Sequence, residues 1–407
     1  MIQRKEYLDL LKKWKDENVI KVITGIRRCG KSTLLALFQE ELRAQGVTND
    51  QIISINFEEL EYEDLLDYKA LYGYIKARLH PEKTTYIFLD EVQQVVNFQK
   101  CVDSLYVKQG VDIYITGSNA YLLSGELATL LSGRYVEINM LPLSFSEFCQ
   151  AKDGGDPEKL LAEYMRNGAL PYVATLEGNT EKVDMYLEGI YNTIIVKDIA
   201  ERQKRKEKDP NKRKVNDIAL LKNISKFLAS SVGNPVSMKS IADYITSGGR
   251  SISQSTVSDY VNALIEPYIF YPVERYDVPG KQLLKTNQKM YIIDLGIRRH
   301  LLPRKRYDLG FSLENTVYLE LLRRGYEVNI GKVGTEEINF VARKNDRIDY
   351  FQVTASMLEE STFNRVMASL KAISDNYPKT VITLDSYAPG NYEGIQVVNA
   401  IDWLLNQ

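Results

Sequence analysis

A glycine-rich segment near the start of the chain has the residue types and spacing of a phosphate-binding loop. Residues 25–32 read Gly-Ile-Arg-Arg-Cys-Gly-Lys-Ser, which matches the pattern G-x-x-x-x-G-K-[ST] in full. In such a loop, successive backbone N–H groups turn toward the β-phosphate of a nucleotide. Lys31 would contact the β- and γ-phosphate oxygens, and Ser32 would supply a hydroxyl ligand to Mg²⁺. The segment therefore predicts a nucleotide site with Mg²⁺.

The predicted nucleotide contacts cover most of this loop and the residue after it. The glycines permit the tight backbone turn, and the side chains that follow lie at the N-terminus of a predicted helix. For Cys29, a small residue tolerated in the loop is a simpler interpretation than catalysis. The predicted set is Gly25, Arg28, Cys29, Gly30, Lys31, Ser32 and Thr33.

Two acidic residues at the end of an apolar run supply the groups that ATP hydrolysis needs. Residues 86–91 read Tyr-Ile-Phe-Leu-Asp-Glu. A buried strand here would deliver both carboxylates to the sheet edge beside the phosphate loop. Asp90 would hold Mg²⁺ together with Ser32, and Glu91 would act as the base that polarises the attacking water. The cofactors predicted from both motifs are ATP and Mg²⁺.

Three further positions are candidates for completing the site. Asn119, or Ser118 beside it, follows the strand-like run at 111–116 and would orient the water if that strand lies between the two motif strands. A plain polar turn is the alternative. Arg134 precedes another apolar run and would either stabilise the phosphoryl group of a neighbouring subunit or serve as a surface arginine. Pro171 would either cover the adenine ring or only break a helix.

Alternating strand-like and helical patterns predict the domain that carries these residues. Short apolar runs alternate with helical patterns over the first 150 residues, which is typical of a parallel sheet covered by helices on both faces. We therefore predict an α/β ATPase domain, an αβα sandwich, at residues 1–150. The runs are 19–24, 52–57, 85–90, 111–116 and 135–140.

The remaining sequence divides into three predicted segments. Residues 151–230 read as helices, interrupted at 202–214 by a basic stretch that is either a solvated loop or a phosphate-contacting one. Residues 231–300 have the order helix, turn, helix and β-hairpin, which is that of a winged-helix domain. Residues 301–407 alternate between helix and strand and form a small α/β module.

Composition narrows the classes of function. The 407 residues carry a formal net charge of −2, so any contact with nucleic acid must come from a local patch. Three scattered cysteines argue against a disulfide framework and structural zinc, and two histidines disfavour histidine-based catalysis. The N-terminus lacks a signal-peptide pattern, and no stretch is apolar enough to span a bilayer. We expect a cytoplasmic protein without membrane contact.

Together, these motifs resemble a prokaryotic family of AAA-type ATP-binding proteins, over essentially the whole chain. The resemblance implies an AAA ATPase domain followed by a helical lid and a C-terminal region of unknown function. AAA-type proteins usually act as rings, so it also implies a homo-oligomer, for example a hexamer, in which Arg134 completes the next subunit's site. The segments that carry the resemblance are 25–32, 87–91, 116–118, 131–134, 141–145, 168–172, 190–194 and 197–198.

The last module resembles a restriction-endonuclease-like fold that has lost its metal ligands. Such nucleases hold Mg²⁺ with an acid on the first helix, an acid on the second strand and the Glu of a Glu-x-Lys on the third strand. Glu314 matches the helix acid, but amides and a hydroxyl replace the other groups, and amides bind Mg²⁺ far less well than carboxylates. Asp346 or Asp349 could substitute only with a shifted strand register. We therefore expect no nuclease activity. The altered positions are Asn339, Gln352 and Thr354.

Two functions stay open at the level of sequence. The first is a ring-forming ATPase that couples ATP turnover to the binding or remodelling of DNA. The alternative is an ATP-controlled switch or scaffold that docks protein partners through its C-terminal domains with little turnover. The predicted winged helix, basic stretch and nuclease-like module each favour nucleic acid, but all three also occur as protein-docking surfaces. An ATP-gated nuclease is disfavoured by the altered ligand positions.

Overall fold

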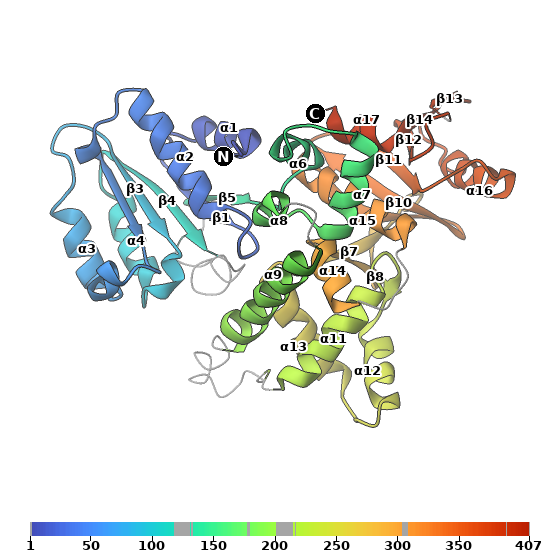
Figure 1. The fold of residues 1–407 in the computed structure, drawn as a ribbon, viewed down its shortest axis with the longest axis horizontal. Coiled ribbons are helices and arrows are strands. Elements are labelled where there is room, and N and C mark those ends of the chain that lie inside the picture. The colour runs from blue at the N-terminus through green and yellow to red at the C-terminus, as the bar shows by residue number, and fades with distance from the viewer. Residues whose placement is uncertain are drawn as a thin grey trace. The chain divides into compact units, whose positions relative to one another are not determined.

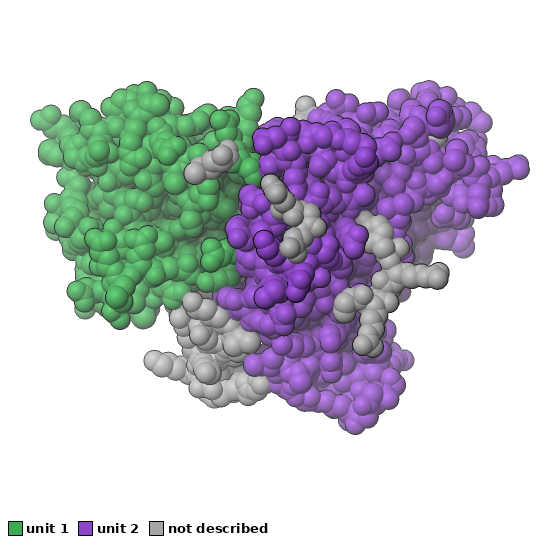
Figure 2. All heavy atoms as spheres, viewed as in Figure 1, with its two compact units in different colours: residues 1–142, 266–268 green, residues 143–265, 269–407 purple. Residues whose placement is uncertain are grey.

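The computed structural model describes residues 2–117, 131, 133–176, 180–200, 215, 217–302, 308–387 and 389–406. The chain divides into two compact units (Figure 2). The first unit comprises residues 1–142 and 266–268, and the second comprises residues 143–265 and 269–407.

A five-stranded parallel sheet forms the centre of the first unit (Figure 1). Its strand order is β2-β3-β4-β1-β5, which confirms the predicted parallel α/β fold. The strands are β1 (Ile20–Thr24), β2 (Ile52–Asn56), β3 (Thr85–Asp90), β4 (Val111–Gly117) and β5 (Tyr135–Asn139). The helices of this unit are α1 (Lys5–Lys13), α2 (Lys31–Ala44), α3 (Tyr68–Lys76) and α4 (Phe98–Tyr106), with short 3₁₀ turns η1 (Asn49–Gln51), η2 (Leu60–Leu65) and η3 (Val92–Gln94).

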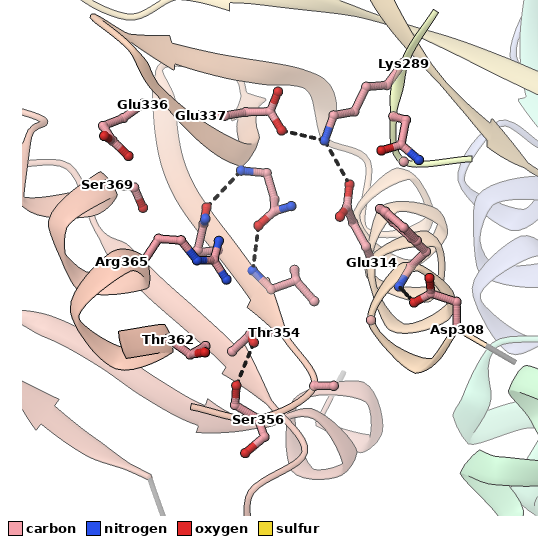
Figure 3. A pocket seen from close by; sticks show the side chains of 18 of the residues that line it. Lys289, Asp308, Glu314, Glu336, Glu337, Thr354, Ser356, Thr362, Arg365 and Ser369 are labelled. Atoms are coloured by element: carbon pink, nitrogen blue, oxygen red, sulfur yellow. Dashed lines mark hydrogen bonds and ion pairs between the residues drawn. The ribbon is translucent and has the colours of Figure 1, made fainter. Parts of the chain in front are cut away.

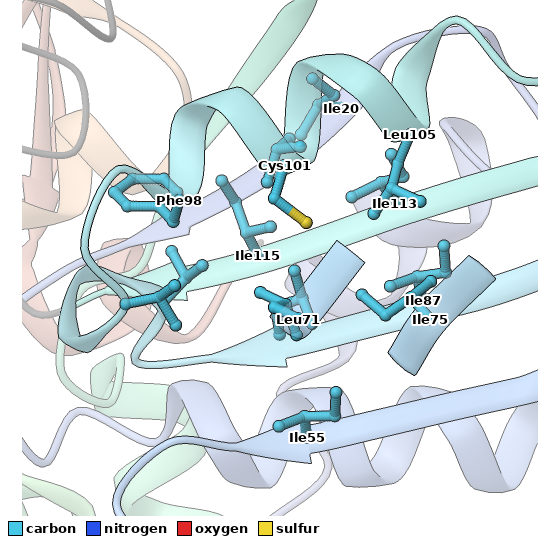
Figure 4. Close-up of a cluster of buried hydrophobic side chains, with 14 of the residues drawn as sticks. Ile20, Ile55, Leu71, Ile75, Ile87, Phe98, Cys101, Leu105, Ile113 and Ile115 are labelled. Carbon is cyan, nitrogen blue, oxygen red and sulfur yellow. The ribbon is translucent and has the colours of Figure 1, made fainter. Parts of the chain in front are cut away.

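Helices cover both faces of this sheet because its strands are apolar on both sides. On one face, side chains of α3 and α4 such as Leu71 and Leu105 pack with Ile87 and Ile113 of the sheet in a fully buried cluster (Figure 4). On the other face, Phe38 of α2 packs against the aromatic rings of β3 and β4. Because the strands are parallel, their carboxyl ends, and the loops that follow them, lie at the same edge of this covered sheet.

A buried ion pair joins two central strands near the edge opposite the phosphate loop. The Lys21 ammonium on β1 pairs with the Asp112 carboxylate on β4, and the two side chains are 0% and 1% exposed. The Asp112 carboxylate also accepts hydrogen bonds from the Tyr114 hydroxyl, at 2.8 Å, and from the backbone N–H of Asp16, at 2.9 Å. The negative charge of the buried Asp112 carboxylate is therefore balanced by one cation and two hydrogen-bond donors.

The second unit combines helices with a nine-stranded mixed sheet of order β13-β14-β12-β11-β10-β9-β7-β8-β6 (Figure 1). Its helices are α6 (Phe145–Ala151), α7 (Pro157–Asn167), α8 (Pro171–Thr175), α9 (Thr180–Thr193), the π-helical η5 (Ile194–Ala200), α11 (Ile218–Ser230), α12 (Met238–Ser247), α13 (Gln254–Ile265), α14 (Leu295–Leu301), α15 (Leu309–Arg323), α16 (Glu360–Lys371) and α17 (Ala400–Leu405). Its strands are β6 (Pro235–Val236), β7 (Phe270–Asp277), β8 (Gln282–Ile292), β9 (Glu327–Val333), β10 (Glu336–Lys344), β11 (Arg347–Thr354), β12 (Lys379–Thr383), β13 (Gly390–Tyr392) and β14 (Ile395–Asn399).

The structure joins the two C-terminal segments that the sequence separates near residue 300. The expected order of helix, turn, helix and hairpin is present as α12, α13, β7 and β8. However, β7 also pairs in parallel with β9, so the hairpin and the C-terminal α/β module share one sheet. Periodicity identifies a strand but not its partner, and this pairing links residues more than 50 positions apart.

None of the helices that the structure describes combines the length and the apolar character needed to cross a membrane.

Candidate nucleotide-binding site

The phosphate loop lies between β1 and α2, where the backbone must turn sharply. Gly25 and Gly30 have φ values of 143° and 104°, which side-chain-bearing residues rarely adopt. A Cβ at Gly25 would also overlap the backbone carbonyl oxygen of Met140. Within the loop, Arg28 is exposed with a φ of 68°, whereas Cys29 is buried. The two glycines are therefore required by the path of the backbone as well as by phosphate chemistry.

Arg4 fixes this loop from outside the motif, and sequence reasoning missed it. Its buried guanidinium donates to the carbonyl oxygen of Cys29, at 2.9 Å, and to that of Leu141, at 2.7 Å. The loop and the segment after β5 are thus held together by a charge-assisted bridge. Nothing near Arg4 in the sequence signals this contact, because its partners are backbone atoms.

Lys31 begins α2 with its ammonium group turned over the loop. The side chain is 4% exposed, and Nζ donates to the carbonyl oxygens of Gly25, at 3.1 Å, and Ile26, at 3.3 Å. Nζ also lies 4.0 Å from Oε1 of Glu91. The next side chains, Ser32 and Thr33, are exposed at the first turn of α2.

Asp90 and Ser32, the two predicted magnesium ligands, lie together at the end of β3. Burial raises the pKa of Asp90, while hydrogen bonds with the hydroxyls of Ser32 and Thr116 oppose the shift by stabilising the carboxylate. A carboxylate and a hydroxyl at the phosphate loop are oxygen donors of the kind that Mg²⁺ takes alongside nucleotide phosphates. These residues fit a magnesium ion.

Thr116 connects the two acids, a role that the sequence did not predict for it. Its hydroxyl donates to Oδ1 of Asp90 and accepts the backbone N–H of Glu91, at 3.0 Å. It stands near the tip of β4, and β4 lies between β1 and β3, which is the condition under which the sequence predicts a role for this tip. The polar residues considered at that tip, Ser118 and Asn119, lie outside the described residues. The sequence predicts the strand at 111–116 that carries Thr116. The order of the strands in the sheet is the signal that would have identified this residue.

Glu91, the predicted base, has a left-handed backbone conformation with a φ of 54°. This conformation turns the chain out of β3 and into η3. The Glu91 carboxylate is buried and accepts a hydrogen bond from the side-chain amide of Gln93. The predicted base is thus held near Lys31 by the backbone contact with Thr116 and the side-chain contact with Gln93.

Arg134 lies at the other edge of the sheet from the phosphate loop. β1 and β5 are parallel, with Ile20 opposite Tyr135, so Arg134 stands beside the start of β1 while the loop follows its end. At about 3.3 Å per residue, roughly 15 Å separates the two edges. The Arg134 guanidinium pairs with Asp103, lies 5.5 Å from the ring centroid of Tyr106, and its side chain is 40% exposed. The fold does not bring this arginine to its own chain's site.

Comparison with known proteins relates these features to a family. Residues 17–149 match the AAA domain family, and residues 158–308 match a domain of unknown function (DUF8612). An uncharacterized protein of Haemophilus influenzae is 41% identical over 410 aligned residues, which cover 100% of this chain and 99% of the relative. An uncharacterized protein of Methanocaldococcus jannaschii is 30% identical over 383 aligned residues, which cover 88% of this chain and 79% of the relative.

The chain belongs to a prokaryotic family of AAA-type proteins. Its AAA domain precedes the domain of unknown function, as the resemblance in the sequence implies. Among solved structures, a Walker-type ATPase of Pyrococcus abyssi has a TM-score of 0.49 and 14% identity, covering 74% of this chain and 96% of that one.

Pro171, the predicted adenine contact, is the first residue of α8 in the second unit. The turn before it is anchored by Asp294, whose carboxylate accepts the N–H groups of Ala169, at 2.6 Å, and Ile297, at 3.0 Å. Gly168 has a φ of 88°, and a Cβ there would overlap the Asp294 carboxylate. Burial raises the pKa of Asp294, and these backbone hydrogen bonds oppose that shift. All of these contacts lie within the second unit. They account for the conformation of the turn without any contact with adenine.

The four nuclease-like positions, in contrast, come together in the second unit. Glu314, Asn339, Gln352 and Thr354 line one cavity of about 680 Å³ (Figure 3). Among the residues that the structure describes, the lining includes neither Asp346 nor Asp349. Asp349 is instead engaged by Arg347, at 2.7 Å. The strand register therefore places Asn339 and Gln352 in the cavity lining, and Asp346 and Asp349 outside it.

Proposed function

We propose that the AAA domain binds ATP with Mg²⁺ and hydrolyses it. The arrangement around Thr116 is the observation that supports this most directly, because one hydroxyl contacts both Asp90 and Glu91. Lys31 lies 4.0 Å from Glu91, so a phosphate ligand, a metal ligand and a base would meet at one phosphate chain. This combination is what phosphoryl transfer to water needs.

In this proposal each residue has one role. Lys31 and the N–H groups of the phosphate loop bind the phosphates, while Ser32 and Asp90 hold Mg²⁺, which neutralises phosphate charge when bound. Glu91 accepts a proton from the attacking water. Thr116 positions the carboxylate of Asp90 and the backbone of Glu91.

We further propose that the protein acts as a homo-oligomer in which Arg134 reaches a neighbouring subunit's nucleotide. Two observations support a role between subunits rather than within one. Arg134 stands at the sheet edge away from its own phosphate loop, and its side chain is part-exposed. Release from Asp103 would free the guanidinium for a neighbour.

Arg134→Ala is expected to lower kcat for ATP hydrolysis by about 10²-fold, with little change in ATP affinity, because the arginine would act on charge in the transition state. Steady-state ATPase assays and nucleotide titration measure the two effects. Mixing Arg134→Ala subunits with Glu91→Gln subunits should restore part of the activity, because some interfaces then combine an intact arginine with an intact base.

Arg78→Ala is the matched control for this variant. Arg78 also stacks on a tyrosine of the same unit, with 3.5 Å from its guanidinium carbon to the Tyr74 ring centroid. Its removal should leave kcat unchanged. A wild-type rate in Arg134→Ala, or a lack of recovery on mixing, would remove the role in a neighbouring site.

DNA is the partner that we propose for ATP-coupled work. The basic stretch at 202–214 supports this partner through its charge, and the helix, helix and hairpin order of α12, α13, β7 and β8 supports it through topology. That order is the one of a winged helix. The basic stretch itself lies outside the described residues.

The charge of the second helix favours the alternative, a switch or scaffold with a protein partner. Residues 254–265, which form α13, carry one acidic residue and no basic one. A helix that enters a DNA groove usually presents basic or amide side chains to phosphates and bases. The face of α13 therefore offers little electrostatic attraction for DNA.

The rate of ATP hydrolysis with and without DNA separates the two candidates. Duplex and single-stranded DNA should each be tested over a salt series, with Glu91→Gln protein as the blank for contaminating ATPases. A DNA-dependent rise in rate that falls steeply with salt supports the DNA-coupled ATPase. A rate that ignores DNA, together with nucleotide retained through purification, supports the switch.

A further inference from the structure

The cavity that holds the nuclease-like positions is lined by polar side chains of α15, β8, β10 and β11 (Figure 3). In nucleases of the fold it resembles, this place holds a divalent metal between carboxylates. Within the described ranges, His, Cys, Asp and Glu side chains nowhere gather in threes in a way that could hold a metal ion. The polar side chains of this cavity therefore need an explanation other than metal binding.

The amide side chains of Asn339 and Gln352, at the positions where the resemblance predicts acids, are hydrogen-bonded to the backbone. Oδ1 of Asn339 accepts the N–H of Val353, at 3.0 Å, and Oε1 of Gln352 accepts the N–H of Asn339, at 2.9 Å. An amide binds a metal only through its oxygen. Both oxygens bridge the adjacent strands β10 and β11, so they are not directed at a shared cation.

A lysine ammonium stands between the carboxylates that remain. Nζ of Lys289 lies 2.6 Å from Oε1 of Glu337 and 3.3 Å from Oε1 of Glu314 (Figure 3). The Tyr291 hydroxyl donates to the same Glu314 oxygen, at 2.5 Å. Three elements, β8, α15 and β10, thus converge on one positive charge.

Burial makes this charge arrangement a structural requirement. The side chains of Lys289 and Glu314 are 3% and 8% exposed, whereas Glu337 is 38% exposed toward the cavity. Burial by itself would lower the pKa of Lys289, but the two carboxylates outweigh it and raise the pKa above its usual 10.5. The ammonium therefore stays charged, and removing it would leave a buried carboxylate without a cation.

We propose that Lys289 is the built-in cation of this cavity: its ammonium bridges Glu314 and Glu337 where a divalent metal would otherwise sit. The lysine neutralises Glu314 in the interior and excludes a metal from the place where metal-dependent cleavage would start. The cavity keeps the shape of a nuclease site with an organic cation in it. The inference does not depend on ATP hydrolysis in the other unit.

Metal binding to the full-length, nucleotide-free protein tests this inference. All proteins carry Asp90→Asn, so that the predicted magnesium site of the phosphate loop does not contribute. The probe is Mn²⁺, followed by the loss of the electron paramagnetic resonance signal of the free ion. The parent should show no Mn²⁺ site that Glu314→Gln abolishes. Lys289→Met should gain one site, at least tenfold tighter than any residual binding by the parent.

Three further variants make the result specific. Lys289→Met/Glu314→Gln should lose the gained site, and Lys344→Gln, a change on the same sheet, should not gain one. Lys289→Ala should behave as Lys289→Met does, with more room for the ion. Mn²⁺ at 100 times its Kd should raise the melting temperature of Lys289→Met by about 5 °C.

Two results would overturn the inference. One is a Glu314-dependent Mn²⁺ site in the parent, a comparison that holds even if the lysine variants are insoluble. The other is folded Lys289 variants that bind no more Mn²⁺ than Lys344→Gln does.

Discussion

Glu91→Gln is expected to lower kcat for ATP hydrolysis by about 10²–10⁴-fold while ATP binding stays close to wild type. The amide has the size of the carboxylate but cannot accept the proton of the attacking water. The contacts that place this side chain should persist, because an amide oxygen can still accept the hydrogen bond from Gln93. The loop residues around Lys31 are unchanged, so the phosphates should remain bound.

The measurement is a single-turnover ATPase assay together with the amount of ATP that co-purifies. The variant should retain ATP, and the wild type should hold mostly ADP or no nucleotide. Glu59→Gln is the matched control, since Glu59 is an exposed acid of the same unit and contacts Asn56. Turnover within tenfold of wild type in Glu91→Gln would show that another group activates the water.

Lys21→Met is expected to destabilise the first unit by about 3–5 kcal/mol, because it leaves the Asp112 carboxylate buried without its cation. The cost arises from the unpaired charge rather than from a lost attraction. Lys21→Met/Asp112→Leu removes both charges and should therefore recover most of the stability. The hydroxyl of Tyr114 and the N–H of Asp16 then lose an acceptor, so recovery should be incomplete.

Denaturant unfolding followed by tryptophan fluorescence measures this loss. The chain has two tryptophans, Trp14 in the first unit and Trp403 in the second, so a Trp403→Phe background reports on the first unit alone. Lys12→Met is the control, because the Lys12–Glu41 pair is solvent-accessible and should contribute less than about 1 kcal/mol. A loss below that size in Lys21→Met would mean that water or another cation reaches Asp112.

The sequence by itself predicted those parts of the candidate site whose residues are neighbours along the chain. The loop at 25–32 and the acids Asp90 and Glu91 each follow a fixed local spacing, and their flanking apolar runs predict the strands that present them. The five-stranded parallel sheet follows from the same alternation. A local pattern determines these features because consecutive elements of the chain, a strand, a turn and a helix, position the phosphate-loop residues, and the end of one strand positions the acids.

Tertiary structure decided everything that depends on which distant segments pair. Strand order placed Thr116 against both acids, and backbone acceptors gave Arg4 its role in holding the loop. The pairing of β7 with β9 merged two segments that periodicity separates. Lys289 belongs to β8 and meets Glu314 only because the sheet and α15 close on each other. Such contacts are fixed by packing and burial across the whole unit, and spacing along the chain carries no record of them.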